Sequence, residues 1–102
     1  MMINYRFKKM INSRRPVLVH FYAEWCRPCY QLLPVLQVVK TTFKDQIRIM
    51  KVNVDHNPAI ASQFRVRSLP TLILFQSGEI KWMTEGVMES AELTKILREF
   101  VS

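Results

Sequence analysis

Two cysteines separated by two residues directly follow a short apolar run, and this arrangement restricts the folds open to the chain. Residues 16–23, PVLVHFYA, are rich in β-branched and aromatic side chains and too few for a helix. Such a run predicts a β-strand buried on both faces. Cys26 and Cys29, the only cysteines in the 102 residues, come next, and Pro28 suits the first turn of a helix. We therefore expect a strand, a turn that carries the cysteine pair, and a helix.

The rest of the chain alternates between strand and helix patterns. Apolar residues recur at helical spacing after the cysteines, and Pro34 lies within that stretch, where proline bends a helix. Asn57 and Pro58 are typical of a helix start, and Ser77 with Gly78 predicts a tight hairpin turn. The expected elements after the first strand are a helix over residues 26–43, a second buried strand over 47–55, a short helix over 58–64 and strands over 71–76 and 79–86. An amphipathic helix over 89–102 follows, with one face formed by Leu93, Ile96, Leu97, Phe100 and Val101.

These elements predict an α/β fold with a single domain over residues 1–102. A strand–helix–strand unit requires a right-handed crossover and a parallel pair, and the hairpin adds antiparallel strands to the same sheet. Helices must then cover both faces, which gives a three-layer α/β/α sandwich around a mixed sheet. Phe7, Met10 and Ile11 suggest a short first helix, and residues 1–4 leave room for at most an abbreviated edge strand. The sheet is therefore expected to have four or five strands.

The net charge of +7 raises the question of nucleic-acid binding. The basic residues are scattered, however, and no aromatic-interleaved stripe or known nucleic-acid motif accompanies them. No run approaches the roughly 20 apolar residues of a membrane helix, and no apolar signal-peptide core follows the basic N-terminus. We therefore expect a cytoplasmic protein that binds neither nucleic acid nor membranes.

A cysteine pair with this spacing can be a structural disulfide, part of a metal site or a redox centre. The cytoplasm keeps structural cysteines reduced, which argues against the first. Zinc normally takes four ligands, and His20 and His56 have no spacing that completes a site with a single cysteine pair. We therefore prefer a redox centre and expect no metal, with a zinc site and an inert dithiol as the alternatives.

The expected helix gives the two sulfur atoms different roles. Cysteines three residues apart in its first turn lie on one face, close enough to bridge. Cys26 lies at the helix N-terminus, where free N–H groups and the helix dipole favour the thiolate, which is the attacking species. Cys29, one turn further along, should be more buried. Cys26 is thus the candidate nucleophile that forms a mixed disulfide with a partner, and Cys29 is the candidate that resolves it.

Several separate segments of the chain resemble the thioredoxin family. EWCRPC is preceded by PVLVHFYA and followed by SLPTLILFQSGE, and the KVNVD strand and the EG before the last helix agree in order and spacing. The resemblance runs from about residue 16 to the C-terminus. It implies the thioredoxin fold and a thiol–disulfide oxidoreductase that reduces protein disulfides. Such a chain cycles through a Cys26–Cys29 disulfide and needs no bound cofactor.

The resemblance also assigns residues around the cysteine pair. Pro70 matches the family's cis-proline, which lies against the disulfide and offers a backbone edge to the substrate peptide. Trp25 matches the flanking tryptophan, Lys51 a lysine beneath the site, and Gly86 a glycine beside the substrate groove, although a role in backbone shape explains Gly86 equally well. The implied substrate-binding residues are Trp25, Arg27, Pro28, Ser68, Leu69, Pro70 and Gly86.

The chain departs from the family at two positions near the sulfur atoms. Arg27 replaces the usual glycine with a permanent positive charge, which favours the thiolate and raises the reduction potential unless the side chain extends into solvent and is screened. His20 stands where the family usually has a buried aspartate and shares a strand face with Leu18 and Tyr22. We expect His20 to be catalytic as the proton acceptor for Cys29, with a core histidine bonded to the backbone as the alternative.

The expected partners follow from the same resemblance. They are protein disulfide substrates and a thioredoxin reductase, an NADPH-dependent flavin enzyme that supplies electrons, while the chain itself is expected to be a monomer. Arg27, Arg65 and Arg67 should surround the substrate groove and favour partners with acidic residues near their disulfide. Two alternatives remain: the arginine spacer makes the chain a thiol oxidase or isomerase, or the fold serves as a non-catalytic binding subunit.

Overall fold

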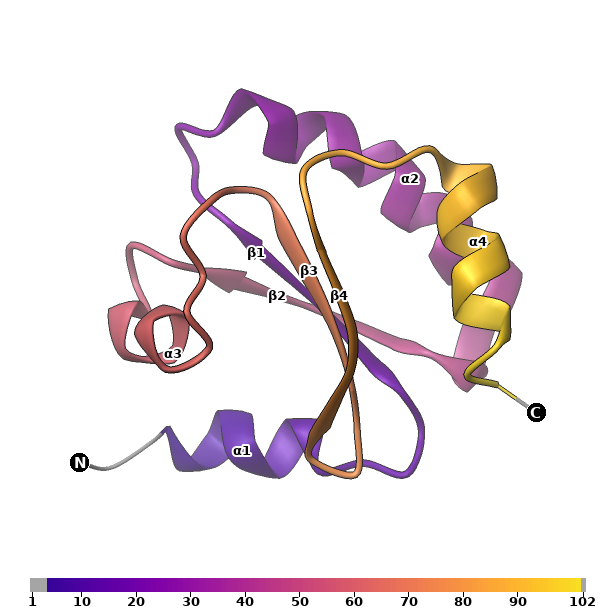
Figure 1. Cartoon of the computed structure of the whole chain (residues 1–102), viewed down its shortest axis with the longest axis horizontal. Helices are drawn as coiled ribbons and strands as arrows, with labels where there is room; N and C mark the ends of the chain where they lie inside the picture. The colour runs from indigo at the N-terminus through magenta and orange to yellow at the C-terminus, as the bar shows by residue number, and fades with distance from the viewer. Residues whose placement is uncertain (1–3, 102) are drawn as a thin grey trace.

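Strand β1 (Val17–Tyr22) lies inside a four-stranded mixed sheet with the order β2-β1-β3-β4 (Figure 1). The structure, a computed structural model, describes residues 4–101. β1 pairs in parallel with β2 (Arg48–Asn53) and antiparallel with β3 (Thr71–Gln76), and β3 pairs antiparallel with β4 (Glu79–Glu85). All of β1 but its last residue is buried, as predicted from its apolar run, because a strand flanks it on each side and core residues cover both of its faces.

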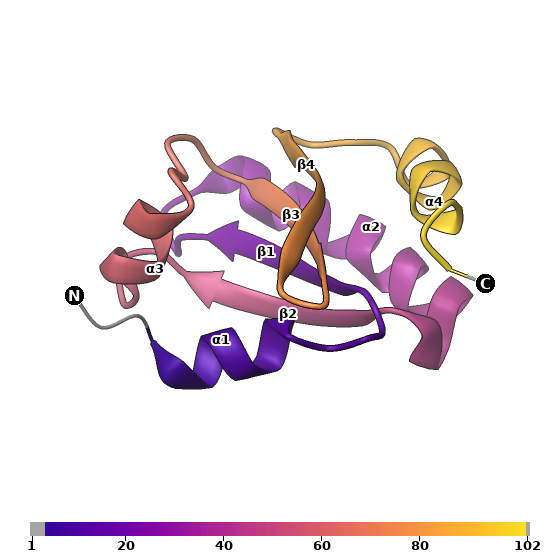
Figure 2. The same cartoon turned by 60° about the horizontal axis from the view of Figure 1, so that its bottom comes forward.

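Helices cover both faces of this sheet and give the predicted three-layer sandwich (Figure 2). α2 (Arg27–Phe43) and α4 (Ser90–Arg98) pack on one face, and the 3-10 helix η1 (Lys44–Gln46) follows α2. α1 (Tyr5–Ile11) and α3 (Pro58–Gln63) pack on the other face. The predicted α/β class and the short first helix are therefore confirmed.

Alternating residues of the central strands divide the apolar core into two halves. Leu18 of β1 and Leu74 of β3 belong to the half under α2 and α4, whereas Val19 and Ile73 belong to the half over α1 and α3. Each such side chain, when fully buried, contributes roughly 1.5–3 kcal/mol relative to exposure. Packing on both faces fixes the position of β1 between the two helix layers, and therefore also the position of the residues that follow β1.

The hairpin between β3 and β4 turns at Ser77 and Gly78, which both have positive φ (54° and 82°). Positive φ at both central residues is the geometry of a tight two-residue hairpin turn. The Ser77 N–H donates to the carbonyl oxygen of Ser13 (2.7 Å), and the Gly78 N–H donates to that of Ile11 (3.1 Å). The predicted hairpin is confirmed, and its turn is anchored to the segment that links α1 to β1.

Strand β2 is not the second buried strand that was predicted. It forms an edge of the sheet that residues 4–101 build, and Arg48 and Lys51 are exposed while Val52 and Asn53 are buried. The reason is the strand order, which gives β2 a described neighbour, β1, on one side only. The apolar pattern of this segment does not distinguish an edge strand from an inner one, because Arg48 and Lys51 are long side chains whose apolar stems can be buried while their charges stay in water.

Smaller differences concern the ends of elements. α4 ends before Phe100 and Val101, so these residues lie beyond the helix, although both pack against its core half. Asn57 precedes α3 as predicted, but its side-chain amide donates to the last carbonyl of β2 (3.0 Å) and does not cap the helix. Within the expected edge strand over residues 1–4, Asn4 caps α1 with its side chain, and residues 1–3 lie outside the described residues.

Candidate active site

The turn after β1 places Cys26 at the start of α2. The Cys26 N–H donates to the carbonyl oxygen of Ala23 (3.2 Å), and α2 begins at the next residue with Pro28 in its first turn. Cys26 is the N-cap residue, and its Sγ accepts a hydrogen bond from the Cys29 N–H (3.2 Å). That N–H is one of the groups at a helix start that find no carbonyl partner within the helix. The predicted position of Cys26 at a helix N-terminus is confirmed.

A disulfide bond joins Cys26 and Cys29, whose Cα atoms lie 5.4 Å apart. The exposed fractions of the two residues are 4% and 3%, so the expected difference in burial is absent. Ala23 completes this small apolar cluster, and Leu69 packs against it from the loop before β3. The two cysteines differ instead in the space that each one lines.

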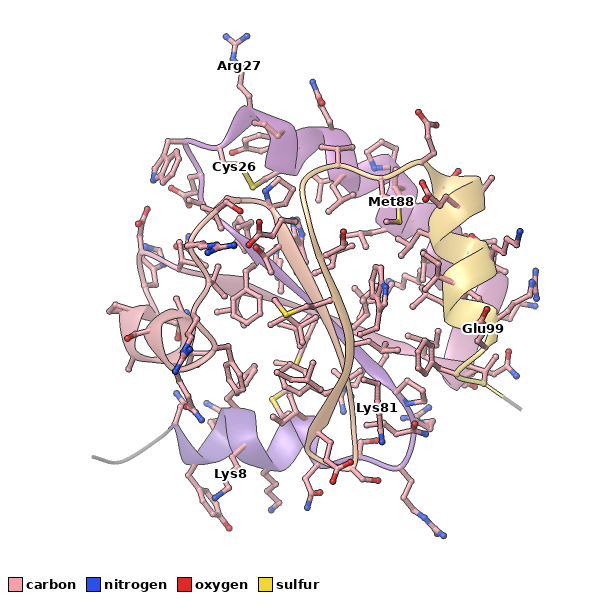
Figure 3. All side chains as sticks on the ribbon, in the orientation of Figure 1. Lys8, Cys26, Arg27, Lys81, Met88 and Glu99 are labelled. Atoms are coloured by element: carbon pink, nitrogen blue, oxygen red, sulfur yellow. A yellow bond between two sulfur atoms is a disulfide. The ribbon has the colours of Figure 1, made fainter. Side chains whose placement is uncertain are left out.

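Cys26 lines an open groove of about 400 Å³, which we call the outer groove. It lies between the start of α2 and the loop before β3, and Arg27 at its rim points away from the body of the protein (Figure 3). Arg67 also lines it and pairs with Glu85 (Nε to Oε2, 3.4 Å), whereas Arg65 is absent from the described lining. The predicted ring of three arginines is therefore reduced to two. The residues of the outer groove are Trp25, Cys26, Arg27, Pro28, Val54, Val66, Arg67, Ser68 and Leu69.

Pro70 and Gly86, which were also predicted to bind substrate, are not part of this lining in the described structure. The Leu69–Pro70 peptide bond is cis, as the resemblance implied. Pro70 is buried, and its carbonyl oxygen accepts a hydrogen bond from the Gly86 N–H (2.8 Å). Gly86 has a φ of 91°, which residues with a Cβ rarely adopt. Gly86 thus shapes and supports the backbone behind the outer groove.

Replacing Gly86 with alanine is expected to lower the free energy of unfolding by about 1–2 kcal/mol, because alanine resists positive φ. An added Cβ has no heavy atom within 4 Å, so the cost comes from the backbone and not from a clash. Equilibrium urea unfolding measures the change. The control is Val87→Ala at the exposed next position, which should change stability by less than about 0.5 kcal/mol. Equal effects in the two variants would contradict the backbone explanation.

Cys29 lines a second, smaller pocket of about 120 Å³, which we call the inner cavity and which is partly open to solvent, because Tyr30 and Leu33 in its lining are exposed. His20 lines the same cavity, is only 3% exposed, and has no hydrogen-bond partner at Nε2 among residues 4–101. Burial, followed by the positive charge of Lys51, lowers the pKa of His20 from 6.5 to about 4. The imidazole is therefore neutral at neutral pH. The residues of the inner cavity are His20, Tyr22, Ala23, Cys29, Tyr30, Leu33 and Lys51.

Asp55 and Tyr30 belong to the site although no motif in the sequence identifies them. Trp25 is 70% exposed, and its Nε1–H donates to Asp55 Oδ2 (2.9 Å). The Asp55 N–H in turn donates to Asn53 Oδ1 (2.9 Å), which holds the turn after β2. The hydroxyl of Tyr30 donates to the carbonyl oxygen of Glu24 (2.8 Å). Asp55 follows the end of a strand parallel to β1, where functional groups gather, but Tyr30 carries no comparable signal.

Sulfur and imidazole are the reactive groups that surround the cysteine pair. Within residues 4–101, no group of three His, Cys, Asp or Glu side chains is arranged to hold a metal ion. None of the helices in that part of the chain has the length and hydrophobicity needed to cross a bilayer. The cysteine pair, which is joined by a disulfide, supports the making and breaking of a sulfur–sulfur bond.

Comparison with known sequences agrees with this chemistry. The sequence profile of the thioredoxin family matches residues 1–99. A thioredoxin-like protein of Synechocystis is 44% identical over 96 residues, which cover 93% of this chain and 91% of the relative. A thioredoxin of Acidithiobacillus ferridurans is 39% identical over 88 residues, which cover 86% of this chain and 82% of the relative.

Solved structures show the same fold. A mutant thioredoxin from Halobacterium salinarum superposes with a TM-score of 0.87 at 29% identity, over 100% of this chain and 88% of that one. Oxidised mitochondrial thioredoxin 3 from Saccharomyces cerevisiae superposes with a TM-score of 0.83 at 29% identity, over 92% and 87% of the two chains. The predicted thioredoxin fold is thereby confirmed. With its cysteine pair at the start of α2, the chain belongs to the thioredoxin family and is a thiol–disulfide oxidoreductase.

Proposed function

We propose that the chain reduces disulfide bonds of proteins, with Cys26 as the attacking cysteine and Cys29 as the resolving one. The Cys26 thiolate attacks one sulfur of the substrate disulfide and displaces the other as a thiolate, which leaves a mixed disulfide. The Cys29 thiolate then attacks Cys26 Sγ, forms the Cys26–Cys29 disulfide and releases the second substrate thiolate. Two electrons pass from the chain to the substrate in one cycle.

The observation that carries this proposal is that the two cysteines line different spaces. Cys26 lines the open outer groove, whereas Cys29 lines the inner cavity. A substrate disulfide bound in the outer groove therefore lies against Cys26 and not against Cys29. The Cys29 N–H donates a hydrogen bond to Cys26 Sγ. The same bond stabilises the negative sulfur of the attacking thiolate.

The outer groove is the proposed substrate-binding surface. Trp25 offers an exposed aromatic face held in place by Asp55, and Leu69 offers an apolar contact beside the disulfide. Arg27 and Arg67 add positive charge, which favours substrates with acidic residues near their disulfide. Pro28 and Ser68 complete the proposed contact surface, and Pro70 and Gly86 hold it from behind.

His20 is the proposed proton acceptor for Cys29, because it lines the same cavity and its Nε2 has no described partner. Its pKa is low beside the disulfide, and a thiolate forming at Cys29 raises the pKa of an adjacent imidazole. His20→Ala is expected to slow resolution of the mixed disulfide by about tenfold at pH 7 and to move the rise in rate to higher pH. His20→Asp, with the family's usual side chain, should restore part of the rate. An unchanged pH–rate profile for insulin reduction would refute the proton transfer.

Electrons are proposed to come from an NADPH-dependent flavin reductase that returns the disulfide to two thiols. The chain is proposed to act as a monomeric single domain over residues 1–102 in the cytoplasm, without a cofactor of its own. A coupled assay with NADPH, thioredoxin reductase and insulin tests this. NADPH oxidation that depends on both the chain and insulin supports the proposal. Turnover with dithiothreitol but not with the reductase would remove this electron donor while leaving the disulfide reductase intact.

Arg27→Gly is expected to lower the reduction potential, because it removes a positive charge that favours the thiolate form. The side chain is exposed and points outward, so solvent screens the charge. We expect a decrease of about 10–20 mV, with about 30 mV corresponding to 1.4 kcal/mol. Equilibration with glutathione buffers measures the potential, and Lys40→Gly on the far part of α2 controls for loss of charge. A decrease far larger than about 20 mV would show that Arg27 makes the couple strongly oxidising, which favours the oxidase alternative.

A further inference from the structure

A second open groove, of about 690 Å³, lies between α2 and strand β2, and we call it the basic groove. Its lining shares no residue with the outer groove and meets the inner cavity at His20, Leu33 and Lys51. Part of its lining is apolar and includes Leu36 and Ile49, and we call this part the apolar floor. Five cationic side chains line it, with Asp45 as the acidic member: Arg15, Lys40, Lys44, Arg48 and Lys51.

Most cations of the basic groove have no ion-pair partner in the part of the chain that the structure describes. Within residues 4–101, no carboxylate lies within 4 Å of the charged group of Lys40, Lys44 or Arg48, and all three residues are exposed. Arg15 donates through Nη1 to the backbone oxygen of Asp45 (2.7 Å), which fixes its charge at one end of the groove. The groove therefore presents several unpaired positive charges around an apolar floor.

The same groove borders β2, whose outer edge has no strand partner within residues 4–101 (Figure 2). The Arg48 N–H donates to Pro16 O (3.0 Å), and the Val54 N–H donates to Tyr22 O (2.9 Å), so even-numbered residues of β2 direct their backbone groups toward β1. Because backbone direction alternates along a strand, the N–H and C=O groups of Ile49 and Lys51 point outward. These groups can receive another strand, as an exposed sheet edge does in β-augmentation.

We propose that the edge of β2 and the basic groove together bind an extended acidic segment of a partner protein. The segment adds a strand beside β2, its backbone pairs with Ile49 and Lys51, and its carboxylates face the unpaired cations. Neither cysteine lines this site, although His20 and Lys51 line both it and the inner cavity, and the inference does not rest on the proposed catalytic cycle. It provides a place where a partner can be held while the outer groove stays open.

Three features favour this occupant over others. A strand edge and an apolar floor suit a polypeptide, whereas a nucleic acid offers phosphates but cannot continue a β-ladder. A second copy of the chain carries the same +7 charge and would bring like charges together. Basic residues on an edge strand also discourage pairing with most other strands. An acidic strand is the exception, because its carboxylates are attracted to these positive charges.

Amide hydrogen exchange measured by NMR tests the proposal on the oxidised full chain. The probe is a nine-residue peptide of alternating Glu and Val, and the control replaces each Glu with Lys. The acidic peptide should slow exchange of the Ile49 and Lys51 amides by about tenfold or more, while those of Arg48 and Met50, already bonded to β1, should change little. The effect should weaken with added salt, and the Lys peptide should produce none.

A pair of matched variants tests the role of charge. Lys40→Glu with Arg48→Glu reverses two cations of the basic groove, and Lys8→Glu with Lys9→Glu reverses two on α1, on the other face of the sheet. Both pairs lower the net charge equally. The groove pair should weaken peptide binding by about tenfold, and the α1 pair by less than about threefold. Insulin reduction should be unaffected in both, which separates this proposal from the catalytic one.

Several outcomes would overturn the proposal. If the acidic peptide does not slow amide exchange at Ile49 and Lys51, the proposal is wrong. The charges would then serve only to prevent other strands from pairing with this edge. Protection of these amides before peptide is added would show that another part of the chain, or a second copy detected by sedimentation, already occupies the edge. A single-stranded oligonucleotide that binds more tightly than the peptide and shifts the same resonances would assign the groove to nucleic acid.

Discussion

A chain with serine in place of Cys26 is expected to reduce insulin no faster than dithiothreitol does alone. The attack requires a thiolate, and a serine hydroxyl remains protonated at neutral pH. Cys29 cannot take over the first step efficiently because it lines the inner cavity and not the outer groove. The loss of rate should be at least about a hundredfold. Turbidity of precipitating insulin B chain measures it.

Cys29→Ser is the matched comparison, since it makes the same cysteine-to-serine change at the other position. This variant keeps the attacking thiolate but cannot resolve the mixed disulfide, so a covalent adduct between the chain and insulin should accumulate. Non-reducing electrophoresis and mass spectrometry detect the adduct, and Cys26→Ser should form little of it. If Cys26→Ser accumulates the adduct and Cys29→Ser does not, the two roles are reversed.

The sequence was sufficient to predict the elements that local signals define. The run of residues 16–23 predicted a strand buried on both faces, and Pro28 after Cys26 placed the cysteine pair at a helix start. Ser77 and Gly78 marked the hairpin because a Ser-Gly pair between two strand-like runs is typical of a tight turn. Four-strand or five-strand topology followed from connection rules that do not depend on side-chain detail. These predictions share a cause that lies within a few neighbouring residues.

The remaining features depend on contacts between distant segments. The edge position of β2 follows from the strand order, and no pattern within 47–55 reveals which strand lies beside it. Trp25 and Asp55 meet because the ends of β1 and β2 lie at the same edge of the sheet. The same applies to the two cysteines: their burial is nearly equal, and only the packing of His20 and Leu69 around them separates an outer from an inner side.

His20 is both a buried residue of the core and the proposed proton acceptor. An imidazole with an unpartnered nitrogen costs free energy in an apolar layer, and the cost is much larger when the ring is protonated. A leucine at this position would avoid both costs. A titratable ring in the cavity that Cys29 lines therefore suits the proposed proton transfer better than it suits stability.

Acid is expected to destabilise the oxidised protein through His20 by on the order of 3 kcal/mol. The pKa of His20 is about 4 in the folded chain and 6.5 in the unfolded chain. As pH falls, the unfolded state therefore binds the proton first. The contribution of neutral His20 to stability is fully present above pH 6.5, declines between 6.5 and about 4, and has been lost below that. Urea unfolding at a series of pH values measures the decline.

The matched variant for this prediction is His20→Leu, because it removes the titrating ring and keeps an apolar side chain of similar size. Carboxylates titrate in the same range, so the informative quantity is the difference in unfolding free energy between wild type and variant at each pH. That difference should change by on the order of 3 kcal/mol in favour of the variant between pH 7.5 and pH 4. His56→Gln removes an exposed histidine and should retain the wild-type dependence. A difference that stays constant with pH would show that the pKa of His20 is the same in the folded and unfolded chains.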